Sequence, residues 1–342
     1  MELFADLLRE PTSKRARRVL GGYAGTGKTT IIAEILRRHP NAGVAVCTPT
    51  GKAAHVLRSK GVPAGTIHSL LYYPPTVTDE GLEFAHVRAR YDLPKVLIVD
   101  EASMLDAKLV EDIERRITKV LYVGDHGQLE PIRNDPGIMR HPDVQLEHIH
   151  RQAEGSPIIR FANIARVGER LVSLTPECRV TGPEPLAELS SFDVVLVGFN
   201  ETRHKLNAWI RHKRGFTGPH PQVGEQVICL RNDKTRRVWN GMTASVVAVD
   251  PVRKLFDLLT DGGPRRNVLY DPTQFGQALA GDRRGGPTAW DWGYAITVHK
   301  AQGSEWSRIA VVEEIASTWD DQRWRYTAAT RAKNELRWII KD

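Results

Sequence analysis

Short apolar runs alternate with helix-like stretches through the first 150 residues. The apolar runs occupy residues 16–23, 43–48, 95–100 and 119–125. Between the first two, residues 28–39 place Ile32, Ile35 and Leu36 at helical spacing. Apolar runs of this length, separated by helices, are typical of parallel strands buried on both faces. The pattern predicts an α/β domain built on a parallel sheet, over residues 1–147.

The second part of the chain, residues 148–342, begins a new strand-and-helix series with the apolar run at 192–200. Its character changes at about 224–288, where short strand-like runs are split by Gly, Asp and Pro, which indicates a small β-rich insert. In the first domain, residues 71–94 contain prolines and a turn-like Asp-Glu-Gly, which predict a hairpin excursion. We therefore expect two α/β domains, the second with a β-rich insert.

Composition narrows the class of protein. The chain has 342 residues, 41% hydrophobic and 26% charged, which suits two folded domains. No apolar run approaches the roughly 18 residues of a membrane helix, and the first residues do not resemble a signal peptide. Three widely spaced cysteines form neither a disulfide framework nor a zinc motif. We expect a cytoplasmic protein without a membrane partner, and the net charge of +7 favours polyanions such as nucleic acids.

Residues 22–29, GYAGTGKT, form a phosphate-binding motif between a predicted strand and a predicted helix. Its glycines let the backbone N–H groups turn toward phosphate oxygens, and the start of the helix adds positive potential. Lys28 can reach the β and γ phosphates of ATP, and the Thr29 hydroxyl can hold Mg²⁺. The predicted nucleotide-binding set is Gly22, Gly25, Thr26, Gly27, Lys28, Thr29, Thr30 and Asp100.

Two further polar segments end predicted strands. Asp100 and Glu101 follow the run at 95–100, where the carboxyl edge of an α/β sheet binds ligands. Asp100 is the second predicted Mg²⁺ ligand beside Thr29, and Glu101 can position and polarise the attacking water. Gln128, after the run at 119–125, is a candidate sensor of the γ-phosphate.

In chain order, these segments resemble the motifs of superfamily 1 helicases, in particular the RecD-like and Dda-like branch. GYAGTGKT resembles motif I, DEAS (100–103) motif II and GDHGQLEP (124–131) motif III. Segments resembling motifs Ia, Ib, IV, V and VI are TPTGKAA (48–54), GTIHSLL (65–71), LEHIHRQ (146–152), GYAITVHKAQGSEW (293–306) and YTAATRAK (326–333). One such match says little, but eight in the family's order are a specific signal.

The resemblance implies two RecA-like P-loop lobes with ATP between them. It implies that Arg151 and Arg331 face the γ-phosphate, and preplaced cations suit the charge on a transferring phosphoryl group. It also implies that the β-rich insert is an SH3-like subdomain, that 71–94 is a strand-separating pin, and that DNA crosses both lobes. The implied DNA contacts are Thr48, Pro49, Thr66, His68, Thr297 and His299. Trp239 is a candidate for stacking on a base, with packing in the core as the alternative, and its neighbour Asn240 is a further candidate contact to nucleic acid.

The resulting hypothesis is a monomeric ATP- and Mg²⁺-dependent helicase or translocase on single-stranded DNA, moving 5′ to 3′ as its branch does. An RNA helicase or RNP-remodelling ATPase is one alternative, because RNA is also a possible partner. A DNA-binding module with an ATP switch but no motor activity is another. Residues 1–21 contain no glutamine, whereas relatives usually read adenine with one there, so the preference among NTPs stays open. Protein partners and pathway also stay open among repair, recombination, replication and plasmid transfer.

Overall fold

The chain divides into two compact units, Met1–Ser156 and Pro157–Asp342. The boundary predicted after residue 147 lies a little before this division. The computed structural model describes residues 1–11, 13–72, 76–78, 81–83, 93–131, 134–148, 155–183, 186–231, 233, 236, 238–260, 262–277 and 289–340. No helix in this described part is both long and apolar enough to cross a membrane.

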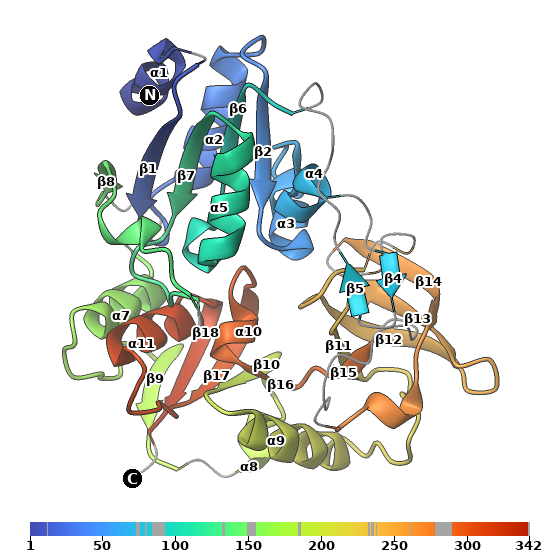
Figure 1. Cartoon of the computed structure of the whole chain (residues 1–342). Helices are drawn as coiled ribbons and strands as arrows, with labels where there is room; N and C mark the ends of the chain where they lie inside the picture. The colour runs from blue at the N-terminus through green and yellow to red at the C-terminus, as the bar shows by residue number, and fades with distance from the viewer. Residues whose placement is uncertain are drawn as a thin grey trace. The chain divides into compact units, whose positions relative to one another are not determined.

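Unit 1 is built on a six-stranded sheet in the order β3-β2-β6-β7-β1-β8, and all neighbouring strands are parallel (Figure 1). The predicted parallel sheet is confirmed. The strands are β1 (Ala16–Gly22), β2 (Val44–Thr48), β3 (Ala64–Thr66), β6 (Val96–Val99), β7 (Lys119–Gly124) and β8 (Val144–Leu146). The helices are α1 (Glu2–Arg9), α2 (Lys28–Arg38), α3 (Gly51–Ser59), α4 (Ile67–Leu71) and α5 (Ala107–Arg116), with short 3₁₀ turns η2 (Ala102–Met104) and η3 (Ile138–Arg140).

Burial of strand β6 on both faces explains why its sequence is a continuous apolar run. Leu97 and Val99 pack on one face of the sheet with residues of α4 and α5. Val96 and Ile98 pack on the other face with residues of α1, α2 and α3. Because successive side chains of a strand point to opposite faces, a strand covered on both sides needs apolar residues at every position.

The predicted excursion at 71–94 contains two short strands, β4 (Thr76–Thr78) and β5 (Gly81–Glu83), which pair antiparallel as in a hairpin. Residues 73–75, 79–80 and 84–92 lie outside the described part of the chain. A strand-separating role for this segment stays a prediction.

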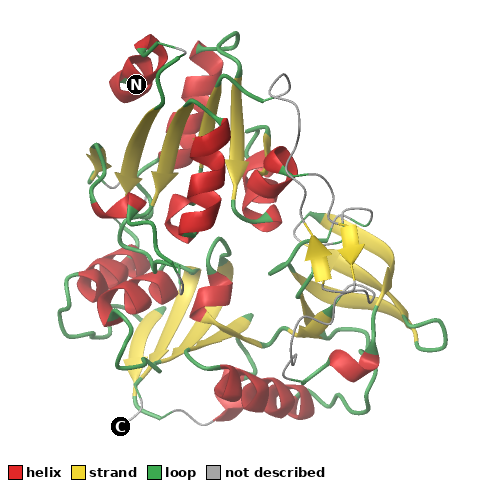
Figure 2. Cartoon of the chain, in the orientation of Figure 1, coloured by secondary structure: helices red, strands yellow, loops and turns green. Residues whose placement is uncertain are grey.

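Unit 2 contains a second parallel sheet, in the order β16-β10-β17-β18-β9 (Figure 2). Beside this sheet, the ring of Trp338 of β18 contacts the rings of Phe161 of α7 and Trp324 of α11. The strands are β9 (Cys178–Thr181), β10 (Val194–Val197), β16 (Ala295–Thr297), β17 (Trp306–Val312) and β18 (Ala332–Ile339); the helices are α7 (Pro157–Arg166), α8 (Leu186–Leu189), α9 (Asn200–Lys213), α10 (Val298–Ala301) and α11 (Asp321–Ala329).

The β-rich segment of unit 2 is a five-stranded antiparallel sheet in the order β14-β13-β12-β11-β15. Buried aromatic rings of Phe256, Tyr270, Trp290 and Trp292 form much of its core. The similarity of this sheet to an SH3 domain stays a prediction. The elements are β11 (Gln226–Cys229), β12 (Thr243–Asp250), β13 (Leu255–Thr260), β14 (Gly263–Leu269), η4 (Pro272–Gln274) and β15 (Trp290–Trp292).

Candidate active site

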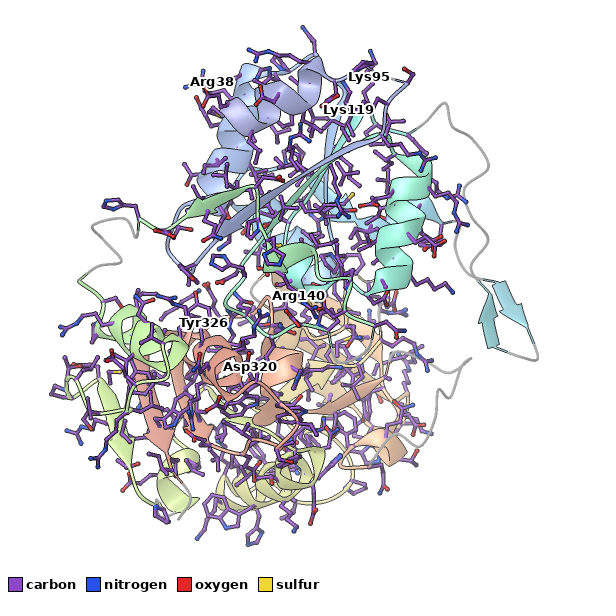
Figure 3. All side chains as sticks on the ribbon, turned by 60° about the vertical axis from the view of Figure 1, so that its left-hand side comes forward. Arg38, Lys95, Lys119, Arg140, Asp320 and Tyr326 are labelled. Atoms are coloured by element: carbon purple, nitrogen blue, oxygen red, sulfur yellow. The ribbon has the colours of Figure 1, made fainter. Side chains whose placement is uncertain are left out.

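The predicted site residues of unit 1 lie at or just after the carboxyl ends of its strands. Because the sheet is parallel, these ends meet at one edge, where α/β sheets bind ligands. The neighbouring strands β6, β7 and β1 carry the predicted nucleotide residues, while β2 and β3 carry the predicted DNA contacts. Arg38, Lys95 and Lys119 mark the opposite end of unit 1 (Figure 3). The sheet order therefore places the predicted nucleotide residues and the predicted DNA contacts side by side along one edge.

The loop after β1 has the backbone that a phosphate cradle requires. Gly25 and Gly27 have φ of 80° and 83°, which side chains disfavour. A Cβ on Gly22 would lie 2.6 Å from the Thr26 hydroxyl oxygen, so the loop cannot close over a larger residue. The helix α2 begins at Lys28 and directs the N–H groups of its first turn into this loop. These features fit the phosphates of a nucleotide.

Lys28 is held over the loop by neutral partners. Its Nζ donates hydrogen bonds to the carbonyl oxygens of Gly22, at 2.7 Å, and Tyr23, at 3.0 Å. Within the described residues, no carboxylate pairs with this ammonium group. Its charge is therefore available to phosphate oxygens. Thr26 is buried and donates to the Tyr23 carbonyl at 2.8 Å, whereas Thr29 is half-buried and Thr30 exposed in the first turn of α2.

Asp100 and Glu101 follow β6 in a constrained turn. Asp100 is buried, and its backbone N–H donates to the Cys47 carbonyl at 2.9 Å. Burial, and next the negative charge of Glu101, raise the pKa of the Asp100 carboxyl. A bound cation would offset both effects, so this carboxylate suits a divalent metal such as Mg²⁺. Glu101 has φ of 58°, unusual for a residue with a side chain, and strain of this kind is common at functional sites.

Ser103 lies two residues further, in the 3₁₀ turn η2, and is buried. Its Oγ has no hydrogen-bond partner within the described part of the chain. Buried hydroxyls are normally satisfied, so an orphaned one beside Asp100 and Glu101 fits a site completed by a ligand, its metal or water. Sequence reasoning did not single out Ser103, although it belongs to the DEAS segment.

Gln128 is also buried, on the turn after β7. Its Nε2 donates to Asp125 Oδ2 at 3.1 Å, and Asp125 Oδ1 accepts from the backbone N–H of Gly127 at 3.0 Å. These bonds fix the turn that follows β7, and β7 lies between β6 and β1. Gln128 is therefore held on the same sheet edge as Lys28 and Glu101.

Two aromatic residues connect the phosphate loop to this turn, and sequence reasoning missed both. The ring of Tyr23 lies 4.2 Å from the ring of His126, centroid to centroid. A Cβ on Gly21 would lie 2.6 Å from Pro142 Cγ and 2.9 Å from His126 Nδ1, so only glycine allows this approach. The positions inside the two motifs were the available signal, but their contact across β1 and β7 required the sheet order.

The predicted DNA contacts of unit 1 differ in how they are presented. His68 is exposed, Pro49 is half-buried, and Thr66 caps α4 by accepting the Ser69 N–H at 3.1 Å. Thr48 is buried, and its hydroxyl donates to the Thr50 carbonyl at 2.8 Å. The Thr48 hydroxyl is thus already used to shape the loop after β2.

In unit 2, Arg331 is a buried cation without an ion pair among the described residues. Its guanidinium donates to the carbonyl oxygens of Thr327 and Ser304 and to the Thr330 hydroxyl. Since all three acceptors are neutral, the charge stays available to an anion such as phosphate. Arg151, the other predicted arginine, lies outside the described residues.

The remaining predicted contacts also lie in unit 2. Thr297 ends β16 and caps α10 by accepting the Lys300 N–H at 3.3 Å. His299 is half-buried, and burial lowers the pKa of its imidazole. Trp239 is half-buried against the core of the antiparallel sheet, next to the exposed Asn240. Core packing and a stacking role for Trp239 therefore both stay open.

Comparisons with known proteins agree on one class. The family model described as AAA domain matches residues 5–175, and the UvrD-like helicase C-terminal domain matches residues 293–339. The ATP-dependent RecD2 DNA helicase of Deinococcus radiodurans is 30% identical, over 93% of this chain and 46% of the relative. The RecBCD enzyme subunit RecD of Mycolicibacterium smegmatis is 26% identical, over 93% of this chain and 67% of the relative.

Among solved structures, the Pif1 helicase from Bacteroides in complex with ADP-AlF3 and ssDNA is similar in fold. Its TM-score is 0.61 at 19% identity, covering 100% of this chain and 91% of that one. At this identity, the likeness concerns the fold alone. The chain spans about half the length of the RecD2 relative, so that protein's full activity does not transfer by similarity.

Proposed function

Because this chain belongs to the AAA domain family and also matches the UvrD-like helicase C-terminal domain, we propose that it is a superfamily 1 helicase of the RecD-like branch, an ATP-dependent motor that moves along single-stranded DNA. One observation carries the proposal. A single edge of the unit 1 sheet holds the phosphate loop, Asp100 and Glu101 beside the ends of β2 and β3, which carry Thr48 and Thr66. A nucleotide and a nucleic-acid strand bound there would contact neighbouring strands of one sheet.

The residues have separate tasks in this proposal. Lys28 and the loop glycines hold the phosphates of ATP, while Thr29 and Asp100 hold Mg²⁺, which would neutralise charge on the phosphates. Glu101 orients and polarises the attacking water. Gln128 and Arg331 stabilise the transferring phosphoryl group, together with Arg151. Each unit carries part of this set. If closure of the two units completes the set, hydrolysis would depend on that closure, as it does in enzymes whose loops or domains close over the substrate.

The finer parts of the proposal are the 5′ to 3′ direction, the monomeric state, an SH3-like identity for the antiparallel sheet, and two RecA-like lobes divided near residue 147. The branch resemblance supports the direction and the subdomain identity. The Pif1 helicase of similar fold was solved in complex with ssDNA, which supports a single-stranded substrate. Duplex separation by residues 71–94 is a further part of the proposal.

The test is steady-state ATP hydrolysis with and without oligo-dT, at low and high salt. A motor that grips phosphates should be stimulated by the strand, and the strand concentration needed should rise with salt. Oligo-rU of the same length tests the RNA alternative in parallel. Hydrolysis that is indifferent to DNA but stimulated by RNA would transfer the proposal to RNA, and indifference to both would overturn it.

Direction has its own measurement. Streptavidin is placed on a biotin at either end of the same oligonucleotide, and ATP-dependent displacement is followed. A 5′ to 3′ motor displaces streptavidin from the 3′ end and leaves the 5′ end occupied. A strand-stimulated ATPase that displaces neither would fit the alternative of an ATP-switched DNA-binding module.

A further inference from the structure

Three aromatic rings of unit 2 meet at the carboxyl ends of three neighbouring strands. The strands are β16, β10 and β17 (Figure 1). Phe199 follows β10, His299 follows β16, and Trp319 lies in the segment after β17. The rings of Phe199 and Trp319 are stacked, with centroids 5.4 Å apart and planes 29° apart. His299 meets Trp319 edge-on, with centroids 5.0 Å apart. We call these three residues the aromatic ledge.

The ledge is held in place by Glu314, which follows β17. Glu314 Oε2 accepts the backbone N–H groups of Gly198 and Phe199, at 3.3 and 3.4 Å. Its Oε1 accepts the Thr202 hydroxyl at 2.7 Å, which ties the first turn of α9 to the same carboxylate. A Cβ on Gly198 would lie 2.0 Å from the Glu314 carbonyl oxygen, so the backbones of the two segments touch. This contact preorganises Phe199 before any ligand arrives.

The ledge is accessible although it is made of large aromatic rings. Phe199 is 42% exposed, and Trp319 and His299 are half-buried. A rigid exposed ring that is already stacked on one side offers its other face to a planar ligand. Nucleobases are such ligands, and stacking on aromatic side chains tolerates any base.

We propose that the aromatic ledge of Phe199, Trp319 and His299 binds an unpaired nucleobase of the strand along which the protein moves. The proposal rests on the proposed function and adds base-stacking residues to it. Thr297, a predicted backbone contact, lies two residues before His299 on the cap of α10. A strand whose phosphate meets Thr297 would have a base within reach of the ledge.

The base of ATP is another planar ring that could stack on the ledge, but the positions of Arg331 and the ledge along β17 exclude it. Arg331, the unit 2 residue proposed to face the γ-phosphate, lies beside Ser304 and Trp306 at the amino end of β17. The ledge lies at the opposite, carboxyl end. Six residue steps along β17 span roughly 20 Å at about 3.3 Å per residue. A ligand held at one end therefore does not occupy the other.

The experiment measures binding of dye-labelled oligo-dT by fluorescence anisotropy for wild type, Phe199→Leu, Phe199→Tyr and Trp319→Leu. Leucine keeps an apolar side chain but removes the ring, and we expect about 5- to 100-fold weaker binding. Tyrosine keeps the ring and should bind as wild type does. Trp209→Leu, a half-buried tryptophan near the far end of α9, is the matched control and should leave affinity unchanged. Thermal unfolding of each variant reports whether the fold is retained.

An abasic oligonucleotide of equal length separates bases from phosphates. If the ledge stacks a base, Phe199→Leu weakens oligo-dT binding but leaves abasic binding and its salt dependence unchanged. The KM for ATP of a strand-independent basal reaction should also stay constant, whereas a raised KM would assign the ledge to the nucleotide and overturn the proposal. Equal losses on both strands, or none, would also overturn it while leaving the motor itself intact. A wild type that binds neither strand would instead overturn the proposed function.

Discussion

Arg331 donates a hydrogen bond from Nη1 to the Ser304 carbonyl oxygen, at 3.2 Å, across the start of β17. Ser304 ends the segment that begins at Thr297, on the cap of α10. A single stretch of eight residues thus joins a predicted DNA contact to the arginine proposed to face the γ-phosphate. Because Arg331 is buried and bonded only to neutral acceptors, a movement of this segment would change where its charge points.

Arg331→Lys keeps the charge but removes the planar fork of donors. We expect kcat for strand-stimulated hydrolysis to fall by about 10³-fold or more, since an arginine at a transferring phosphoryl group contributes about that much. Steady-state hydrolysis at saturating ATP and oligonucleotide measures it. Arg325→Lys is the control, because Arg325 lies on α11 of the same unit and is paired with Glu313 and Asp321. Similar losses in both variants would mean that Arg331 only stabilises unit 2.

Glu101→Gln tests the assignment of the residue that acts on water. The amide has nearly the same shape but cannot accept a proton, so we expect hydrolysis to fall by about 10²- to 10⁴-fold while ATP still binds. Filter binding of labelled ATP and a phosphate-release assay measure the two properties separately. Glu111→Gln, on the exposed face of α5, is the matched control. Unchanged turnover in Glu101→Gln would remove Glu101 from the chemistry.

Much of the fold could be predicted because burial on both faces leaves a direct mark on the sequence. Strand β6 is apolar at each position, Val96 to Val99, and the glycines of the phosphate loop stand where φ is positive. The resemblance of the motifs to those of superfamily 1 helicases implied a role for Arg331, and the acids after a predicted strand indicated Glu101; both roles stay predictions.

The aromatic ledge could not be predicted in the same way. Phe199, His299 and Trp319 are separated by up to 120 positions, and only the order β16-β10-β17 brings their strands together. The same holds for Tyr23 and His126, whose contact depends on β1 lying beside β7. The hydrogen-bond partners of Arg331 could not be predicted from the sequence either, because two of them are backbone carbonyls that any residue carries.

Gly198→Ala tests the close contact that fixes the ledge. The new methyl would lie 2.0 Å from the Glu314 carbonyl oxygen, so the backbone must move. We expect the free energy of unfolding to fall by about 1–3 kcal/mol, the usual cost of overpacking. Chemical denaturation followed by circular dichroism measures it. Gly182→Ala is the control, since no atom lies within 4 Å of a Cβ there. Equal stability of both variants would contradict the packing described at Gly198.

The three cysteines provide a chemical test of burial in both units. Cys47, Cys178 and Cys229 are buried, and burial raises the pKa of each thiol to about 12. Because the thiolate is the reactive form, its fraction at pH 8 falls to about 10⁻⁴, and labelling should be about 10³-fold slower than for an ordinary thiol of pKa about 8.5. The labelling rate should rise about tenfold per pH unit while the protein stays folded. Absorbance with a disulfide reagent measures it, with urea-unfolded protein as the control that exposes all three thiols. A thiol that reacts rapidly in the folded protein would contradict the burial of its strand.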